Sequence, residues 1–462
     1  MADAAPTPAI DWHQGQPEAA FARAAELGLP LFLYWGAAWC PPCNRIKASV
    51  FERADFIALG DDFVALHIDG DSAGAQQLAE RFRLRSYPTL IVYRPDGTEI
   101  TRLPCELDGA RFVDILKVAL GARRTVAESL SAALSRERVL SDDEWRLLSF
   151  YSWDTDERQV LKSLDFAAML ASLTRACTSP DAVLRLEWHT LHAAAMSGKG
   201  GIDQRAAVKR LEETLADAAA VRAQMDIVTN NAVDLVRFLT APQSPARIRL
   251  THAWAGALER LETDPSLNLA DQLAALRTRV RMSRLGQAID DIEPVARARV
   301  AAAVAAGGGA AMRHQVINTA AGLLSDAGLL DQAEQVLLNE LERSQVPFFF
   351  MHNLAAIAKK RGDPASAVQW YERAWHSATG PATRLQWGAT YLQGLVDFAP
   401  HEGPRIERFA GQMLQEIGAM GDVFCQRNRT QMERIDSKLA LWSGAGAVAS
   451  ALRQAARATP QN

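Results

Sequence analysis

Cysteine is scarce in this sequence, and neither a strong charge bias nor a long apolar segment occurs in it. The five cysteines among 462 residues are too few for the disulfide framework that holds small secreted domains together. The 50 basic and 54 acidic side chains leave a net charge of −4, which gives no reason to expect nucleic acid or an anionic membrane as a partner. No apolar run approaches the roughly 20 residues that a membrane-spanning helix needs.

The N-terminal stretch lacks the features of a secretory signal peptide. Residues 1–20, MADAAPTPAIDWHQGQPEAA, contain neither a basic segment nor an apolar core. We therefore expect a cytoplasmic protein. The same residues would also suit a mature N-terminus left after signal cleavage, and a periplasmic location therefore stays open.

The first quarter of the chain alternates between helix-like and strand-like segments. Apolar periodicity and the turn residues between segments predict, in order, a helix over 17–28, a strand over 29–36, a helix over 41–52, a strand over 62–69, a helix over 73–84, two strands across 89–103 and a helix over 107–120. This order predicts a central sheet with helices on both faces.

Two of the five cysteines stand close together in YWGAAWCPPCNRIK, residues 34–47. Cys40 follows a predicted buried strand and begins the next helix, where unpaired N–H groups and the helix dipole stabilise a thiolate. Cys43 lies one turn along, within reach for a disulfide, and Trp39 would cover the two sulfurs. A Cys-x-x-Cys beside such a pattern indicates a redox pair.

Two other interpretations of the pair are possible. A zinc site needs further ligands, but no second Cys-x-x-Cys exists, and His189 and His192 of WHTLH belong to another region. A structural disulfide would be unusual in a reducing compartment. The redox pair is therefore favoured, and Cys105, Cys177 and Cys425 are interpreted as small buried apolar residues.

The order of elements, WCPPC after an apolar strand and the later segment SYPTLIVYRPDG resemble the thioredoxin family over about residues 10–121. The resemblance implies an α/β thioredoxin-like domain in which Pro88, flanked by Tyr87 and Thr89, is cis and faces the cysteines. It implies that Cys40 is an exposed nucleophile and that Cys43 is the buried resolving thiol. It also implies that the Tyr87–Pro88 turn docks an extended substrate backbone beside the sulfurs. No metal or small cofactor is implied.

Two positions depart from the family pattern. The place of the buried acid that precedes the first cysteine holds Tyr34, and the place of the lysine on the next strand holds Ala65. The proton relay that thioredoxins use for the resolving thiol is therefore missing. Water, the Tyr34 phenol or another group must accept that proton.

After residue 121 the strand-like runs end and amphipathic helical patterns begin. Two segments, 320–341 and 354–375, align with an offset of 34, the period of tetratricopeptide repeats, which they resemble. The pairs that align are Gly328 with Gly362, Ala333 with Ala367, Leu337 with Tyr371, and Leu341 with Trp375. We expect three parts: a thioredoxin-like domain over 1–121, a helical domain over 122–310, and tetratricopeptide-like helical pairs over 311–455.

These features lead to two hypotheses for function. The first is a thiol–disulfide oxidoreductase that exchanges Cys40 and Cys43 with protein substrates, which the helical array recruits. An external thiol reductant or oxidant protein would reset the pair, and the direction of electron flow stays open. The alternative is a non-catalytic binding scaffold or chaperone-like module with a redox-sensing thioredoxin-like domain.

Overall fold

The computed structural model describes residues 10–13, 16–156, 159–161, 165–198, 201–285, 292–442, 444 and 446–457. In the N-terminal stretch 1–20, which lacks the features of a signal peptide, residues 1–9, 14 and 15 lie outside this description. Among the helices described, none is long and apolar enough to cross a membrane.

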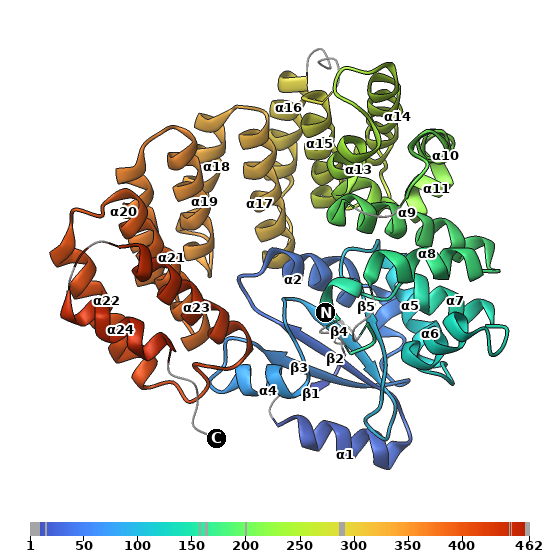
Figure 1. Ribbon diagram of the computed structural model, residues 1–462, viewed down its shortest axis with the longest axis horizontal. Helices are drawn as coiled ribbons and strands as arrows, with labels where there is room; N and C mark the ends of the chain where they lie inside the picture. Colours follow the sequence, from blue (N-terminus) through green and yellow to red (C-terminus); the bar gives the residue numbers. More distant parts are fainter. Residues whose placement is uncertain are drawn as a thin grey trace, which may run out of the picture. The chain divides into compact units, whose positions relative to one another are not determined.

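The N-terminal part contains one mixed five-stranded sheet (Figure 1). Its strands are β1 Trp12–His13, β2 Leu31–Gly36, β3 Val64–Asp69, β4 Thr89–Tyr93 and β5 Glu99–Leu103. They lie in the order β1-β3-β2-β4-β5, with β1 parallel to β3 and β4 antiparallel to β5. Every residue of β2 is buried, as its continuous apolar run predicts. Strand β1 was not predicted, since two residues are too short to show a period.

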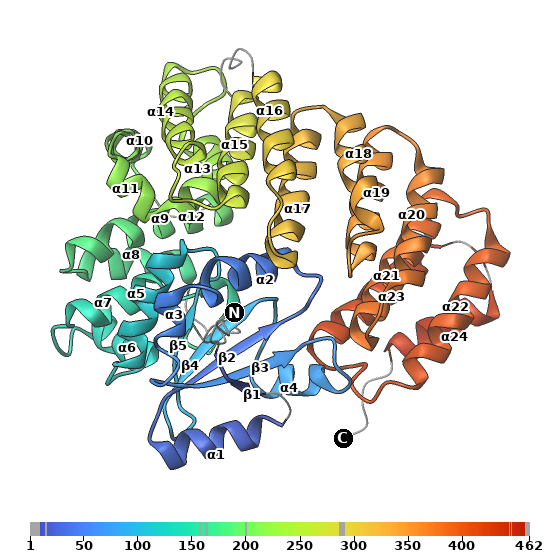
Figure 2. The ribbon, with the colours of Figure 1, turned by 180° about the vertical axis from the view of Figure 1, so that it is seen from behind.

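The helices of this part are α1 Pro17–Leu27, α2 Pro41–Ile46, the π-helical turn η1 Lys47–Phe51, α3 Ala54–Ile57, α4 Ala75–Arg81 and α5 Gly109–Leu120. Helix α1 lies on one side of the sheet, and α2 and α5 lie on the other (Figures 1 and 2). The α/β prediction is therefore confirmed.

The predicted helix over 41–52 is not one regular α-helix. It changes to a π-helical turn at Lys47, where the Ser49 hydroxyl donates to the Arg45 carbonyl over 2.7 Å. A side chain that bonds to a carbonyl four residues back competes with the regular helical hydrogen bond there. The cysteine pair is thus followed by an irregular helical turn, a feature often found at functional sites.

From residue 121 onward, the described residues form helices and connecting segments, without a strand. The helices up to residue 329 are α6 Val126–Ser135, α7 Asp142–Ser149, the short 3-10 helix η2 Trp153–Thr155, α8 Phe166–Ala176, α9 Pro180–Ser197, α10 Gln204–Ala216, α11 Ala218–Ala223, α12 Met225–Asn230, α13 Ala232–Leu239, α14 Pro245–Glu262, α15 Leu269–Ser283, α16 Ile292–Ala306 and α17 Ala310–Asp326. Buried Trp188 and Trp254 pack together at the centre of one core. The predicted change from mixed to helical structure is confirmed.

The C-terminal part of the chain continues as helices. They are α18 Leu330–Leu341, α19 Pro347–Lys360, α20 Pro364–Ser377, α21 Pro381–Phe398, α22 Gly403–Gly418, α23 Gln426–Leu441 and α24 Ala447–Arg457. Gly328 and Gly362, which align in the sequence, precede α18 and α20 with φ of +85° and +74°, a conformation that favours glycine. Ala333 and Ala367 are fully buried. Helices lie at both aligned segments, whereas their pairing and their assignment as tetratricopeptide repeats stay predictions.

The contacts divide the chain into two compact units. The first contains Met1–Tyr34, Pro41–His67 and Pro88–Leu329; the second contains Trp35–Cys40, Ile68–Tyr87 and Leu330–Asn462. The second unit therefore joins two short segments of the N-terminal part to the C-terminal helices, and α4 packs on α23 within it. The domain boundaries expected at 121 and 310 stay a prediction.

The start of α5 leaves no room for a side chain at Gly109. A Cβ atom there would lie 2.1 Å from the Ser49 carbonyl oxygen and 2.8 Å from Cδ of Arg53. We expect Gly109→Ala to lower the free energy of unfolding by about 1–3 kcal/mol, the cost of overpacking a tight contact, as measured by urea denaturation. Gly121→Ala is the control, since its nearest neighbour would lie at 3.7 Å. Equal stability of the two variants would contradict the prediction.

Candidate active site

The two cysteines of the predicted pair lie at the start of α2. Cys40 directly precedes the helix, and its backbone N–H donates to the Ala37 carbonyl over 3.3 Å. Cys43 lies in the first turn of α2. Both are thiols in this structure, with exposed fractions of 3% for Cys40 and 0% for Cys43. The expected burial of Cys43 is found, whereas the expected exposure of Cys40 is not.

The side chain of Trp39, next to Cys40, is held by hydrogen bonds on its indole nitrogen. Nε1 donates to Asp71 Oδ2 over 2.8 Å and to Thr383 Oγ1 over 2.9 Å. The ring stacks on Phe349, with centroids 6.2 Å apart, and meets Trp387 edge-on at 5.9 Å. Only 7% of Trp39 is exposed. The residue predicted to cover the sulfurs is therefore itself covered by α19 and α21.

The phenol of Tyr87 lies in the same aromatic cluster. Its ring centroid is 5.4 Å from Trp35 and 5.9 Å from Trp39, and its hydroxyl accepts a hydrogen bond from Gln76 Nε2 over 3.1 Å. A Cβ atom on Gly70 would lie 2.2 Å from the Tyr87 hydroxyl. Glycine at position 70 therefore makes the room in which this phenol lies.

Pro88 and Thr89 follow Tyr87, with Thr89 as the first residue of β4. Both are buried. The cis form of the bond before Pro88 and the substrate-docking role of Trp39, Tyr87, Pro88 and Thr89 stay predictions.

A residue that the sequence did not indicate, Arg427 at the start of α23, completes the cluster. Its guanidinium carbon lies 5.1 Å from the Trp39 centroid and 4.7 Å from the Tyr87 centroid, within range of cation–π attraction. Its side chain also donates to Gln386, and its backbone N–H donates to Gln76 Oε1 over 3.2 Å. Burial lowers the pKa of Arg427, while Tyr87, Asp71 and Cys40 act to raise it.

Asp71 is a strongly perturbed carboxyl group beside this cluster. Burial raises its pKa to about 6, and the charge of Asp69 adds to the rise. Hydrogen bonds from Thr383 and Trp39 and the charge of Arg427 act in the opposite direction. Perturbed groups of this kind gather at functional sites.

Tyr34, the predicted alternative proton relay, is 2% exposed on β2. Its ring stacks on His67 with centroids 4.8 Å apart and meets Phe51 edge-on at 5.1 Å. Lys47 lies over the same ring at 5.8 Å. Ala65, at the place of the family's lysine, is buried. The relay role of Tyr34 stays a prediction, and His67 is a titratable neighbour that the sequence reading missed.

The helix that bears Cys43 is fixed by Arg45. The guanidinium forms a two-pronged ion pair with Asp271 of α15, at 2.7 and 3.0 Å. It also donates to the carbonyls of Cys105 and Leu107, both over 3.0 Å. Burial raises the pKa of the Cys105 thiol well above its usual value, and the charge of Glu106 acts on it in the same direction. Cys105 is therefore held as a neutral thiol, which is a poor nucleophile.

The histidines weighed as zinc ligands lie on α9. Burial lowers the pKa of His189 to about 3 and also lowers that of His192. Across the described parts of the chain, no three side chains of the His, Cys, Asp or Glu types are grouped so that they could hold a metal ion.

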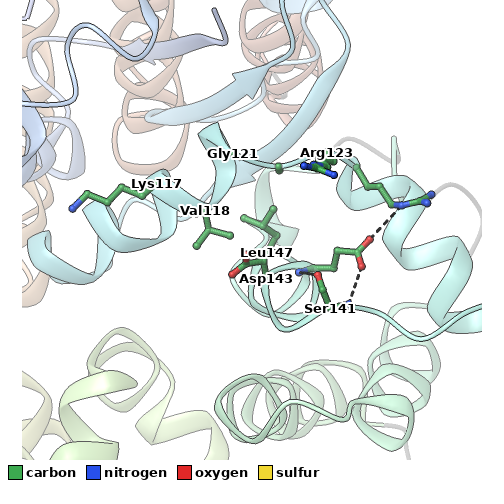
Figure 3. A pocket seen from close by; sticks show the side chains of 10 residues that line it. Lys117, Val118, Gly121, Arg123, Ser141, Asp143 and Leu147 are labelled. Carbon is green, nitrogen blue, oxygen red and sulfur yellow. Dashed lines mark hydrogen bonds and ion pairs between the residues drawn. The ribbon is translucent and has the colours of Figure 1, made fainter.

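A cavity of about 350 Å³ lies away from the predicted site residues, between the end of α5 and the start of α7 (Figure 3). Lys117, Arg123, Ser141 and Asp143 are among its lining residues. The Glu144 carboxylate on its wall accepts hydrogen bonds from the Ser141 backbone N–H and from Arg138, and the Glu144 backbone N–H donates to Ser141 Oγ. The carboxylate of Glu144 is thus already paired.

Comparison with known proteins identifies the N-terminal part. A thioredoxin-like domain model matches residues 17–120. The chain is 30% identical over 96 residues to the thiol:disulfide interchange protein DsbD 2 of Pseudomonas aeruginosa. The alignment covers 20% of this chain and 16% of that protein. It is also 28% identical over 140 residues to a protein disulfide-isomerase of Schizosaccharomyces pombe. That alignment covers 28% of this chain and 37% of that protein. The chain thus spans well under half the length of either relative.

Among solved structures, a DsbH oxidoreductase aligns with a TM-score of 0.23 and 17% identity, over 27% of this chain and 94% of that chain. The family match agrees with the resemblance seen in the sequence, which covers nearly the same residues.

The raised pKa of Asp71 makes stability depend on pH. A folded-state pKa of about 6 against an ordinary value of 3.8 means that its stabilising contribution is complete below pH 3.8 and is lost as the pH rises through 6. We expect the unfolding free energy of the wild type to fall relative to Asp71→Asn by on the order of 2–3 kcal/mol between pH 4 and 7, measured by urea denaturation. Asp61→Asn, at an exposed position, is the control. A pH-independent difference would refute the assignment.

The pair of Arg45 and Asp271 is buried, with side chains 9% and 8% exposed. Asp271→Asn would leave the guanidinium buried without its counter-charge, and we expect a loss of about 3–5 kcal/mol in unfolding free energy. Glu80→Gln, which breaks the half-exposed pair with Arg429, should cost at most about 1 kcal/mol. Similar losses in the two variants would argue against a structural role for the buried pair.

Proposed function

We propose, on the premise that residues 17–120 form a thioredoxin-like domain, that the protein is a thiol–disulfide oxidoreductase acting on protein thiols and disulfides. The observation that carries the proposal is the placement of two thiols at the first turn of α2, directly after the buried strand β2. Cys43 is fully buried, which suits a resolving thiol that meets only its neighbour.

In the reducing direction, the Cys40 thiolate attacks one sulfur of a substrate disulfide. The substrate S–S bond breaks, a mixed disulfide with Cys40 forms, and the second substrate sulfur leaves as a thiolate that takes up a proton. Cys43 then loses its proton and attacks the Cys40 sulfur, which releases the remaining substrate thiol. Two electrons pass from the dithiol to the substrate, and Cys40 and Cys43 become a disulfide.

The pair must then be reset by a second dithiol protein that reduces it. In the oxidising direction, the same steps run in reverse, and a disulfide-bearing protein restores the bond. The Tyr87–Pro88 turn would pair with the substrate backbone while the mixed disulfide exists. The paired C-terminal helices would recruit the partner, as arrays of this kind present extended binding surfaces.

One observation favours the alternative of a redox-sensing scaffold. Cys40 is almost completely buried, and its neighbour Trp39 is bonded to Thr383 of α21. A change in the oxidation state of Cys40 would therefore alter the surroundings of Trp39 and of α21, one of the helices that could bind a partner. No catalytic turnover would be needed.

Single cysteine variants separate these two functions. Cys40→Ser should reduce the turnover of a protein disulfide to the rate without enzyme, because the attacking sulfur is lost, whereas Cys177→Ser should leave it unchanged. Cys43→Ser should accumulate mixed disulfides, which can be identified by mass spectrometry of non-reduced samples.

The double variant Cys40→Ser/Cys43→Ser provides the decisive contrast. If it retains full biological activity, the scaffold alternative holds. An empty trap in Cys43→Ser, under conditions where the wild type cycles, would count against protein substrates.

A further inference from the structure

Arg427 holds its charge in an unusual position. It comes from α23, close to 400 residues along the chain from Cys40, and yet its guanidinium lies over the rings of Trp39 and Tyr87. Trp39 is the residue next to Cys40, and Tyr87 is the residue before Pro88. The two rings that flank the predicted redox site are thus joined by one cation.

The surroundings of Arg427 compensate for the cost of burying this charge. Removing an ion from water costs several kcal/mol unless opposite charges or hydrogen bonds replace the solvent. The guanidinium donates to the neutral amide of Gln386, and the anionic forms of Asp71 and Cys40 stabilise its charge. By reciprocity, a cation that is stabilised by a thiolate also stabilises that thiolate.

We propose that Arg427 is a positioning residue of the redox site, which stabilises the Cys40 thiolate and holds Trp39 and Tyr87 beside it. This inference rests on the proposed function and extends it, because it makes α23 a part of the reactive centre rather than only a surface for partners. When Cys40 ionises, its proton leaves to solvent and Arg427 keeps its own, so the net charge of the two groups falls from +1 to 0.

Other charged groups act on the same place. The titratable and charged residues that face Arg427 and its cluster are Asp69 at the end of β3, Asp71 after it, Tyr87 before β4, Cys40 before α2 and Arg434 on α23. Ionised Asp71 competes with the Cys40 thiolate for the charge of Arg427. Arg427 therefore stabilises the thiolate most when Asp71 is neutral or when its oxygens accept the hydrogen bonds from Trp39 and Thr383.

The test is the pH dependence of Cys40 alkylation, followed on the Cys40 peptide by mass spectrometry in the full chain carrying Cys43→Ser. Removing a nearby cation should raise the alkylation midpoint of Arg427→Gln by about 1 pH unit, roughly a tenfold loss of thiolate below the midpoint. Arg427→Lys keeps the charge but lacks the planar group that stacks on the rings, and we expect a smaller rise.

Arg429→Gln is the matched control on the same helix. Arg429 pairs with Glu80 at the surface, with side chains 50% and 46% exposed, so its loss should leave the midpoint unchanged. If Arg427→Gln does not fold, Arg427→Lys carries the test. An unchanged or lowered midpoint in the folded Arg427 variants, or an equal rise in Arg429→Gln, would overturn the inference.

This readout does not depend on turnover. A raised midpoint in Arg427→Gln, together with no turnover of protein disulfides by the wild type, would leave the role of Arg427 intact and refute the proposed oxidoreductase. Normal turnover with an unshifted midpoint would refute the role of Arg427 alone.

Discussion

The indole N–H of Trp39 is shared between two oxygens, Asp71 Oδ2 and Thr383 Oγ1, and Thr383 in turn donates to Asp71. This three-membered network joins the loop before the cysteines, the segment after β3 and helix α21. A buried indole N–H needs a partner, and a carboxylate that accepts two hydrogen bonds tolerates burial better than one that accepts none. The network holds the side chain of Trp39, the residue next to the buried Cys40, in place.

The segments around Cys40 and the C-terminal helices belong to one compact unit. The sequence suggests a reactive domain followed by a separate recruiting array. The contacts instead assign Trp35–Cys40 and Ile68–Tyr87 to the same compact unit as the C-terminal helices. Gln76 of α4 shows this most clearly, since its backbone N–H donates to Asp422 and its side chain joins Tyr87 to the backbone of Arg427. The C-terminal helices therefore form part of the surroundings of Cys40.

Much of the local structure could be predicted because it follows from local patterns. The apolar run of β2 and the helix after Cys40 each express a rule that acts within a few residues, and Gly328 and Gly362 recur with a fixed offset along the chain. Strand β1 was not predicted because two residues show no alternation of side chains. The π-helical turn contains a hydrogen bond from the Ser49 hydroxyl that no periodicity marks.

Thr383 and Arg427 could not be predicted from the sequence, for a different reason. Periodicity says which face of a helix is buried, but not which distant residue it meets. Thr383 and Arg427 are single polar residues in helices, so no pattern marks them. The sequence therefore located the cysteines but not the distant residues that contact Trp39 and Tyr87.

The exposed fraction of 3% at Cys40 has a consequence for chemical damage. Peroxide converts an accessible thiolate to a sulfenic acid and then to the irreversible sulfinic and sulfonic acids. A sulfur with so little exposed surface meets such small oxidants rarely, even when it is ionised. The burial of Cys40 thus protects the reduced cysteine against overoxidation.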